Sequence, residues 1–116
     1  MNVIIIDNDT ALVKSLAIVL ETKGYKVKGF SRPEEGCFHI IQGHPIDVLI
    51  VDFVMPELNG EQVIERVKDF LPKSCKIILI SGHTGLLDAE DLDTLGITMF
   101  LPKPIDLENL FEVMTA

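Results

Sequence analysis

Short runs of consecutive apolar residues alternate along the chain with longer segments whose apolar residues recur every three or four positions. An unbroken apolar run favours a strand buried on both faces, whereas the longer periodic segments favour amphipathic helices. The runs predict five strands, at residues 3–6, 25–30, 48–51, 76–80 and 97–101. The periodic segments predict five helices, at residues 10–23, from 31–34 to about 43, 60–70, 86–95 and after 106.

Residues that cap helices support these boundaries. Gly24 and Gly96 follow the first and fourth helices, and glycine readily adopts the left-handed conformation that ends a helix. The residues 31–34 have the spacing of a capping box, and Asp106 is a suitable N-cap for the last helix. The residues predicted to face the core in the first, third and last helices are Leu12, Val13, Leu16, Ala17, Val19, Leu20, Val63, Ile64, Val67, Leu107, Leu110, Phe111 and Met114.

Strands that alternate with helices predict an α/β domain with a parallel sheet covered by helices on both sides. With 116 residues, of which 47% are hydrophobic, the chain is long enough to bury one core. No linker, repeat or low-complexity segment divides it. We therefore expect one domain over residues 1–116.

Charge and cysteine content narrow the function. The net charge of -8 argues against direct binding of nucleic acid or of an anionic membrane, and favours cations or basic protein surfaces. Cys37 and Cys75 form neither a disulfide framework nor a metal-ligand pattern, so we expect free thiols. The chain starts with a strand instead of a signal peptide, and no apolar run approaches the ~20 residues that span a bilayer. These features predict a soluble cytoplasmic protein.

Polar residues follow four of the five predicted strands. The residues 7–9 (Asp-Asn-Asp) follow the first strand, Asp52 the third, Ser81 the fourth and Lys103 the fifth. Right-handed crossovers bring the carboxyl ends of parallel strands to one edge of the sheet, where ligands bind in such folds. We therefore expect these side chains to lie together.

Carboxylates that share one site repel each other unless cations balance their charge. The Lys103 ammonium and a divalent, oxygen-seeking ion would do so, and Mg²⁺ needs only a few protein oxygens and leaves room for phosphate. Such a site fits phosphoryl transfer to a carboxylate nucleophile. Asp52 would attack, the metal and Lys103 would neutralise the equatorial oxygens, and Ser81 would hydrogen-bond one of them.

This arrangement resembles, over the whole chain, the receiver domain of response regulators in bacterial two-component signal transduction systems. The family's landmarks fall on residues at matching spacing, namely Asp7, Asn8, Asp52, Pro56, Gly60, Ser81, Gly82, Lys103 and Pro104. The resemblance implies a doubly wound (βα)5 sandwich of the flavodoxin-like kind, with a five-stranded parallel sheet of order 2-1-3-4-5. It also implies that the Lys103-Pro104 peptide bond is cis, a geometry readily available only before proline.

The resemblance implies a phosphorylation-dependent signalling switch and not a turnover enzyme. The domain would catalyse its own Mg²⁺-dependent phosphorylation on Asp52 and the later hydrolysis, with Ser81 and Lys103 binding the phosphoryl group. Its metal ligands would be Asp7, Asn8, Asp52 and the Val54 carbonyl. Ser81 and Phe100 would form the switch that changes the partner-binding face.

The resemblance also implies the partners. The phosphoryl donor would be a sensor histidine kinase or a histidine phosphotransfer domain, and the acceptor of the signal a downstream output protein or domain. A homodimer that forms on phosphorylation is a further partner of this kind. Direct contacts with nucleic acid or membrane are not expected.

Two positions depart from the family pattern. Asn8 stands where the family has a second acidic ligand, and the loss of one negative charge predicts weaker Mg²⁺ binding. Phe100 stands where tyrosine is more common, so it can couple to Ser81 by packing but cannot donate a hydroxyl hydrogen bond.

Two other interpretations of the function remain. A degenerate receiver would act as a phosphorylation-independent interaction module, which Asn8 favours. The residues 4–10 also resemble the nucleophile motif of haloacid-dehalogenase-type phosphatases, in which Asp7 would attack and Asp9 would act as acid and base. That alternative leaves Asp52 without a role and lacks the family's late acidic pair.

Overall fold

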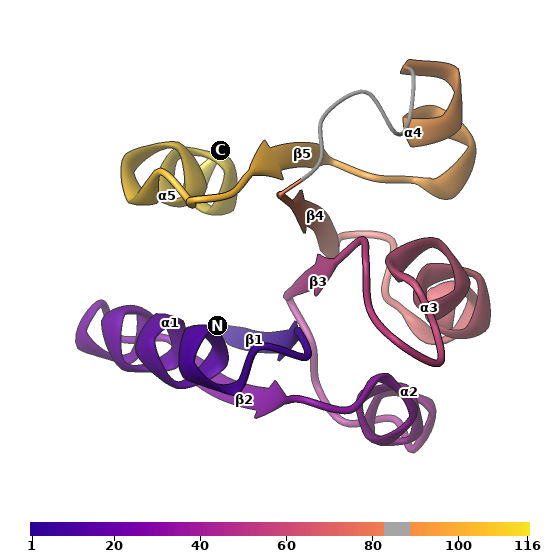
Figure 1. Ribbon diagram of the computed structural model, residues 1–116, viewed down its shortest axis with the longest axis horizontal. Coiled ribbons are helices and arrows are strands. Elements are labelled where there is room, and N and C mark those ends of the chain that lie inside the picture. Colours follow the sequence, from indigo (N-terminus) through magenta and orange to yellow (C-terminus); the bar gives the residue numbers. More distant parts are fainter. Residues whose placement is uncertain (83–88) are drawn as a thin grey trace.

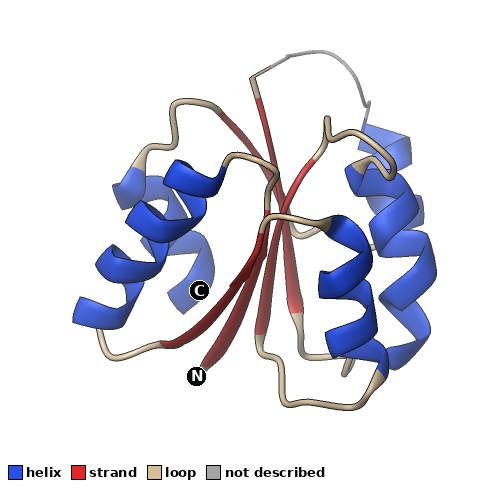
Figure 2. Cartoon of the chain, turned by 60° about the horizontal axis from the view of Figure 1, so that its bottom comes forward, coloured by secondary structure: helices blue, strands red, loops and turns tan. Residues whose placement is uncertain are grey.

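Five parallel strands form one sheet in the order β2-β1-β3-β4-β5, as predicted (Figure 1). Figure 2 shows the sheet between two layers of helices. The computed structural model describes residues 1–82 and 89–116. The strands are β1 (Asn2–Ile6), β2 (Lys26–Phe30), β3 (Val48–Asp52), β4 (Lys76–Ser81) and β5 (Met99–Pro102). The part of the chain that is described contains no helix long and apolar enough to cross a membrane.

Helices cover both faces of the sheet. Figure 1 shows α1 and α5 on one face and α2, α3 and α4 on the other. The helices are α1 (Thr10–Thr22), α2 (Pro33–Ile41), α3 (Gly60–Val67), α4 (Ala89–Leu95) and α5 (Leu107–Thr115), and the 3-10 turn η1 (Lys68–Phe70) follows α3. The fold is therefore the doubly wound arrangement expected from the sequence.

The core forms two clusters, one on each face of the sheet. Ile4 and Ile6 of β1 belong to the cluster under α2 and α3, whereas Val3 and Ile5 belong to the cluster under α1 and α5. This division follows from the alternation of side chains along a strand. All five residues of β3 are buried, as its unbroken apolar run predicted.

The helix termini confirm some of the predicted caps and correct one. Gly24 and Gly96 have positive φ angles of 92° and 72° and end α1 and α4. The predicted capping box at residues 31–34 is wrong, because α2 has Arg32 as its N-cap and no side-chain cap hydrogen bond. Pro33 occupies the first turn, where its fixed φ suits a helix start and its missing N–H needs no partner. This places Ser31 before the cap.

Other boundaries moved by one or two residues. The predicted helix 60–70 divides into α3 and η1. β5 begins at Met99, because the Ile97 N–H still donates to the carbonyl of Leu92 in α4. Leu110 and Met114 are buried as predicted, but Leu107 is 38% exposed at the first turn of α5. The predicted start of the fourth helix and the loop residues His83, Thr84 and Gly85 lie outside the described residues.

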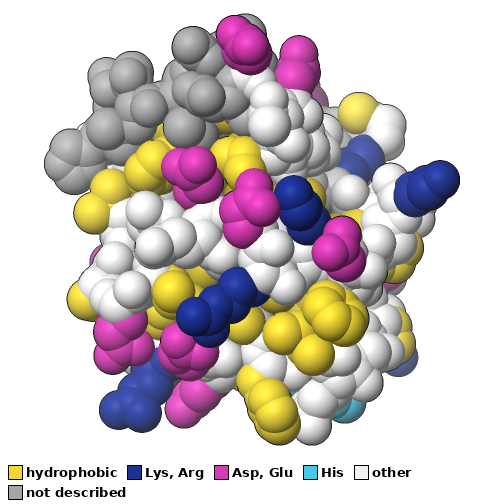
Figure 3. Space-filling model, turned by 90° about the vertical axis from the view of Figure 1, so that its right-hand side faces the viewer, with side chains coloured by type: hydrophobic (Ala, Val, Ile, Leu, Met, Phe, Trp, Pro, Cys, Tyr) yellow, Lys and Arg dark blue, Asp and Glu magenta, His cyan; other side chains and the backbone are white. Residues whose placement is uncertain are grey.

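The face formed by α2, α3 and α4 carries interspersed hydrophobic, acidic and basic side chains (Figure 3). An ion pair of 2.8 Å between Arg66 and Glu34 joins α3 to α2. Phe38 and Ile41 of α2 and Phe70 of η1 are exposed large hydrophobic residues.

Candidate functional site

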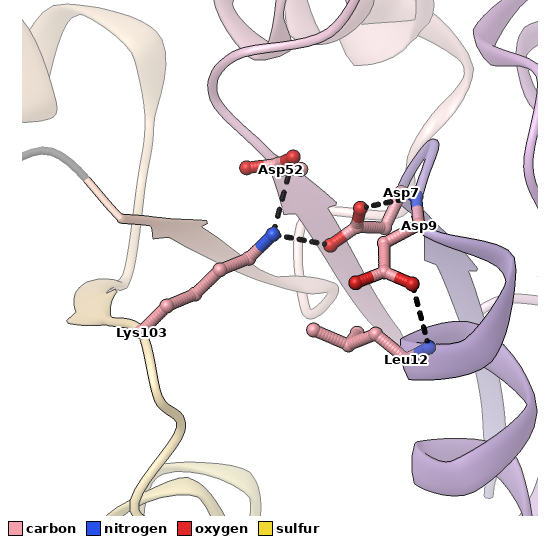
Figure 4. Close-up of polar contacts among 5 residues, drawn as sticks. All are labelled: Asp7, Asp9, Leu12, Asp52 and Lys103. Atoms are coloured by element: carbon pink, nitrogen blue, oxygen red, sulfur yellow. Dashed lines mark hydrogen bonds and ion pairs between the residues drawn. The ribbon is translucent and has the colours of Figure 1, made fainter.

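The carboxyl ends of β1, β3 and β5 bring Asp7, Asp52 and Lys103 together (Figure 4). The Lys103 Nζ lies 2.9 Å from Oδ2 of Asp7 and 3.3 Å from Oδ2 of Asp52. Asp7 is fully buried and Asp52 is 4% exposed. One ammonium group therefore serves two buried carboxylates.

Backbone contacts fix the position of Asp7. Its N–H donates to the carbonyl of Phe30 at 3.1 Å, and its Oδ1 accepts a hydrogen bond of 2.9 Å from the N–H of Asp9. The carboxylate of Asp9 in turn accepts from the N–H of Leu12 and caps α1. Asp9 therefore has a structural role at the helix terminus, and this use leaves the acid and base of the phosphatase reading without support.

A close approach of the backbone holds Asp52 under the start of α3. The N–H of Gly60 donates to the carbonyl of Phe53 at 2.8 Å. A Cβ at position 60 would lie 2.6 Å from the carbonyl oxygen of Asp52 and 2.9 Å from Cα of Phe53. Only glycine therefore fits where α3 meets the end of β3. The same turn contains Glu57, whose φ of 71° is unusual for a residue other than glycine.

The charges at this site do not balance. The pKa of Asp52 is raised, first by burial and then by Asp7, while Lys103 and a hydrogen bond from the Val54 N–H oppose the shift. Burial lowers the pKa of Lys103, but its close contacts with the carboxylates of Asp7 and Asp52 outweigh burial, so its pKa is raised overall. The site therefore holds a cationic lysine and a surplus of negative charge.

The donor set fits Mg²⁺. Oδ2 of Asp7 is the only buried side-chain oxygen or nitrogen in the described residues without a hydrogen-bond partner, although the Lys103 ammonium is its ion-pair partner. No group of three or more His, Cys, Asp or Glu residues in the described ranges forms a cage for a metal. Mg²⁺ suits such a site, because it binds through one or two carboxylates and fills its other positions with water and phosphate oxygens.

The other predicted site residues lie around this centre. Asn8 follows Asp7 and is exposed, and Val54 is 48% exposed two residues after Asp52. Ser81 is fully buried at the end of β4, and its carbonyl accepts a hydrogen bond of 2.8 Å from the N–H of Lys103. Its neighbour Ile80 pairs with Asp52 in the sheet. The Lys103-Pro104 peptide bond is cis.

Phe100 lies apart from the charged centre. It is partly buried on β5 and packs against the core cluster under α2 and α3. The structure thus joins three predicted residues by direct contact, ties Ser81 to them through the backbone, and places Phe100 within the hydrophobic layer.

The sequence analysis missed two backbone features of this edge. The Val54 N–H bonds Asp52, whereas the resemblance assigned a role only to its carbonyl. A reciprocal capping box joins Asn59 to Gln62 at the start of α3. The capping box has a readable signal, a side-chain acceptor followed three residues later by glutamine, but a backbone N–H has no signature in sequence.

The fold and this edge define a doubly wound α/β domain with a buried acidic pair and a lysine at the carboxyl ends of its strands. The family model of the response regulator receiver domain matches residues 3–115. The chain therefore belongs to the receiver domain family of two-component response regulators. Domains of this family are signalling modules and not turnover enzymes.

Several characterised proteins contain a similar domain. The chain is 26% identical over 113 residues to the transcriptional regulatory protein GlrR of Escherichia coli K12 and 30% identical over 112 residues to the regulator NtrC of Azospirillum brasilense. It covers 25% and 23% of their lengths, so the chain spans about a quarter of these relatives. It is also 28% identical to the receiver protein CpdR of Brucella abortus, with 93% of this chain and 88% of CpdR covered.

Solved structures agree with the fold. A receiver protein from Pseudomonas putida superimposes with a TM-score of 0.86 at 27% identity, covering 98% of this chain and 94% of that one. The receiver domain of the hybrid histidine kinase CckA gives a TM-score of 0.81 at 26% identity, with 99% and 96% covered.

Proposed function

We propose that this domain is a phosphorylation-dependent switch in which Asp52 accepts a phosphoryl group from a phosphohistidine of a sensor histidine kinase or a phosphotransfer domain. The observation that carries the proposal is the contact of the Lys103 ammonium with the two buried carboxylates of Asp7 and Asp52. A buried carboxylate beside a fixed cation is suited to attack phosphorus and to keep its product neutralised.

The transfer makes one bond and breaks one. An oxygen of Asp52 attacks the phosphorus, the P–N bond to the donor histidine breaks, and the imidazole leaves with the electron pair of that bond and takes up a proton. The product is an acyl phosphate on Asp52. Lys103 remains protonated, because the carboxylates around it raise its pKa, and its charge offsets that of the phosphoryl oxygens.

Asp7, Asn8, Asp52 and the carbonyl of Val54 would hold Mg²⁺. The ion supplies charge neutralisation at the phosphoryl oxygens when it is bound. Support comes from Oδ2 of Asp7, which is buried and has the Lys103 ammonium as its ion-pair partner but no hydrogen-bond partner among the described residues. Asn8 contributes an uncharged amide, so we expect Mg²⁺ to bind more weakly than at a site with a third carboxylate.

The output would begin at the end of β4. Ser81 would bond the phosphoryl group, and the movement of β4 and β5 would be passed to Phe100 by packing. Support comes from the hydrogen bond between the Lys103 N–H and the Ser81 carbonyl, which couples the two strand ends. The partner-binding face that responds would contact a downstream output protein or domain, or a second phosphorylated copy of the chain.

Phosphorylation is tested by the intact mass of the protein after incubation with acetyl phosphate, with and without Mg²⁺. We expect a Mg²⁺-dependent gain of one phosphoryl group in the wild type and none in Asp52→Asn. A gain that survives in Asp52→Asn but vanishes in Asp7→Asn would support the phosphatase reading. No gain under any condition would support an interaction module that works without phosphorylation.

The variant Asn8→Asp sharpens the same test. It restores the charge that the family pattern expects, and we predict that Mg²⁺ binds about ten-fold more tightly, which corresponds to about 1.4 kcal/mol. Titration of the protein with Mg²⁺ by calorimetry measures this change. An unchanged affinity would mean that position 8 does not contact the ion.

A further inference from the structure

A groove of about 230 Å³ lies away from the phosphorylation site, beside the edge strand β2. Lys26 and Lys28 of β2, His39 of α2 and His44 of the following loop contribute to its walls, together with residues 2–4 of β1. The groove therefore lies towards the amino-terminal ends of β1 and β2, whereas Asp7 follows the carboxyl end of β1.

The groove exists because α2 covers only part of its face of the sheet. Ile6 pairs with Phe30, and both contribute to the hydrophobic cluster under α2. One step back, Ile4 pairs with Lys28, so a lysine occupies the corresponding position on the edge strand. Residues at paired positions of a parallel sheet face the same side, so Lys28 lies on the side covered by α2.

The loop after α2 brings a second imidazole back to the helix. Gly43, with a φ of 87°, turns the chain, and His44 stacks on His39 with ring centroids 4.1 Å apart and planes within 5° of parallel. His39 also contacts the ring of Phe30, at 5.2 Å between centroids. The two imidazoles are therefore held in place on one wall of the groove.

The groove carries positive charge without acidic partners. None of the residues that line it is acidic. Within the described ranges, Lys26 and Lys28 form no ion pair, although the chain has 18 acidic and 10 basic residues. Asp47, which follows the loop, uses its carboxylate to accept a hydrogen bond from the N–H of Asn2. Two lysines and two histidines thus line the groove with no carboxylate among its lining residues.

We infer that this groove binds a small phosphate-bearing anion, such as pyrophosphate or a phosphomonoester, between the two lysines and the stacked histidines. Ammonium groups and protonated imidazoles are donors to phosphate oxygens, and such charge-assisted hydrogen bonds are stronger than neutral ones. The volume accommodates an ion of this size and is below the range typical of larger ligands.

The state of His39 agrees with a positive environment. Its pKa is lowered, first by burial and then by His44 and Lys28, and all three causes favour the neutral imidazole. The groups that face it are Phe30 and Lys28 from β2 and His44 from the loop. A bound anion would offset this positive field and favour protonation of His39, so we expect tighter binding at pH 6 than at pH 8.

The ring-proton resonances of His39 and His44 report binding directly. The metal-free protein is kept in EDTA so that no divalent ion binds beside Asp7 and Asp52. It is titrated with inorganic pyrophosphate and, separately, with ribose 5-phosphate. Sodium chloride at matched ionic strength is the control. We expect saturating shifts of both histidines with one or both phosphates and none with chloride, and the stronger of the two distinguishes an inorganic ion from an organic phosphomonoester.

Two matched variants decide whether the groove is responsible. Lys28→Gln removes a charge from the groove, and Lys73→Gln removes one from an exposed position outside it. We expect Lys28→Gln to weaken binding about ten-fold and Lys73→Gln to leave it unchanged. Equal weakening in both variants, or the absence of saturation at tens of millimolar phosphate, would overturn the inference. Circular dichroism verifies that both variants fold.

Discussion

Two regions of this domain carry unbalanced charge of opposite sign. At the carboxyl ends of the strands, two buried carboxylates share the single ammonium of Lys103. At the other end of β1 and β2, Lys26 and Lys28 are exposed beside two histidines and have no carboxylate partner among the described residues. We call these two regions the acidic edge (Asp7, Asp52 and Lys103) and the basic groove (Lys26, Lys28, His39 and His44). The carboxylates of the acidic edge are buried, whereas the lysines of the basic groove are exposed to solvent.

Burial determines what each imbalance can do. In water a charge is solvated at little cost, whereas in the protein interior the same charge interacts several times more strongly with its neighbours. The buried carboxylates of Asp7 and Asp52 therefore need a cation nearby, which agrees with the proposed Mg²⁺-dependent phosphoryl transfer. In the basic groove, water solvates the excess positive charge, so we expect the groove to bind anions only reversibly and with an affinity that falls as salt is added. Substitutions in the two regions should therefore differ in size.

The largest effect is expected from Gly60→Ala. The added Cβ would lie 2.6 Å from the backbone oxygen of Asp52, and backbone cannot yield as a flexible side chain can. We predict a loss of about 3 kcal/mol in the free energy of unfolding, measured by urea denaturation. Gly82→Ala is the matched control, since a Cβ there meets no atom of the described residues within 4 Å. Equal losses in both variants would contradict the close approach at the acidic edge.

The next effect compares two lysines. Lys103→Met removes the cation between two buried carboxylates, and we predict a loss of about 2 kcal/mol at pH 7 together with the loss of phosphorylation. Lys28→Met removes a solvated charge from the basic groove and should change stability by less than about 0.5 kcal/mol. Urea denaturation of the metal-free variants measures both. Similar losses in the two variants would show that burial does not separate the regions.

Asp52→Asn should stabilise the metal-free protein at neutral pH by about 1 kcal/mol, because it removes one of the two competing negative charges. The pKa of Asp52 is raised from 3.8 in the folded protein, so ionisation of this group destabilises the wild type. The gain should be absent below pH 3.8, grow as the pH rises through the folded pKa, and stay constant above it. Unfolding curves in EDTA between pH 3 and 8 test this, and a gain that is largest at acid pH would contradict it.

The smallest effect concerns the salt dependence of the groove. Addition of sodium chloride should weaken pyrophosphate binding there, because the groups involved are exposed. In contrast, the stability difference between the wild type and Lys103→Met should change little with salt, because both carboxylates are buried and the Lys103 side chain is only 23% exposed. Histidine resonances and urea denaturation at two salt concentrations measure the two responses.

Much of the fold could be predicted because its signals are local. A few neighbouring residues are enough to predict the buried strand β3, the amphipathic helices α1 and α3, and the ends of α1 and α4 at glycine. The start of α2 shows the limit of such reasoning. Two caps compete there within a few residues, and the geometry of Pro33 decided between them.

The proximity of Asp7, Asp52 and Lys103 could be predicted from the sequence, but the electrostatics of the site could not. Crossover handedness indicated that Asp7, Asp52 and Lys103 would share an edge. Burial then decided the sign of the pKa shift of Asp52, and the spacing of residues in the sequence carries no information about solvent access.

The sequence by itself determined the order of strands and helices, the family, and the residues available at the carboxyl edge of the sheet. The tertiary structure alone decided that one ammonium lies between two buried carboxylates, that Gly60 must lack a Cβ, and that His44 returns to stack on His39 beside Lys28. The physical reason is that conformational preference is a property of a few neighbouring residues. Distance and solvent exposure between residues far apart in sequence arise only when the helices pack on the sheet.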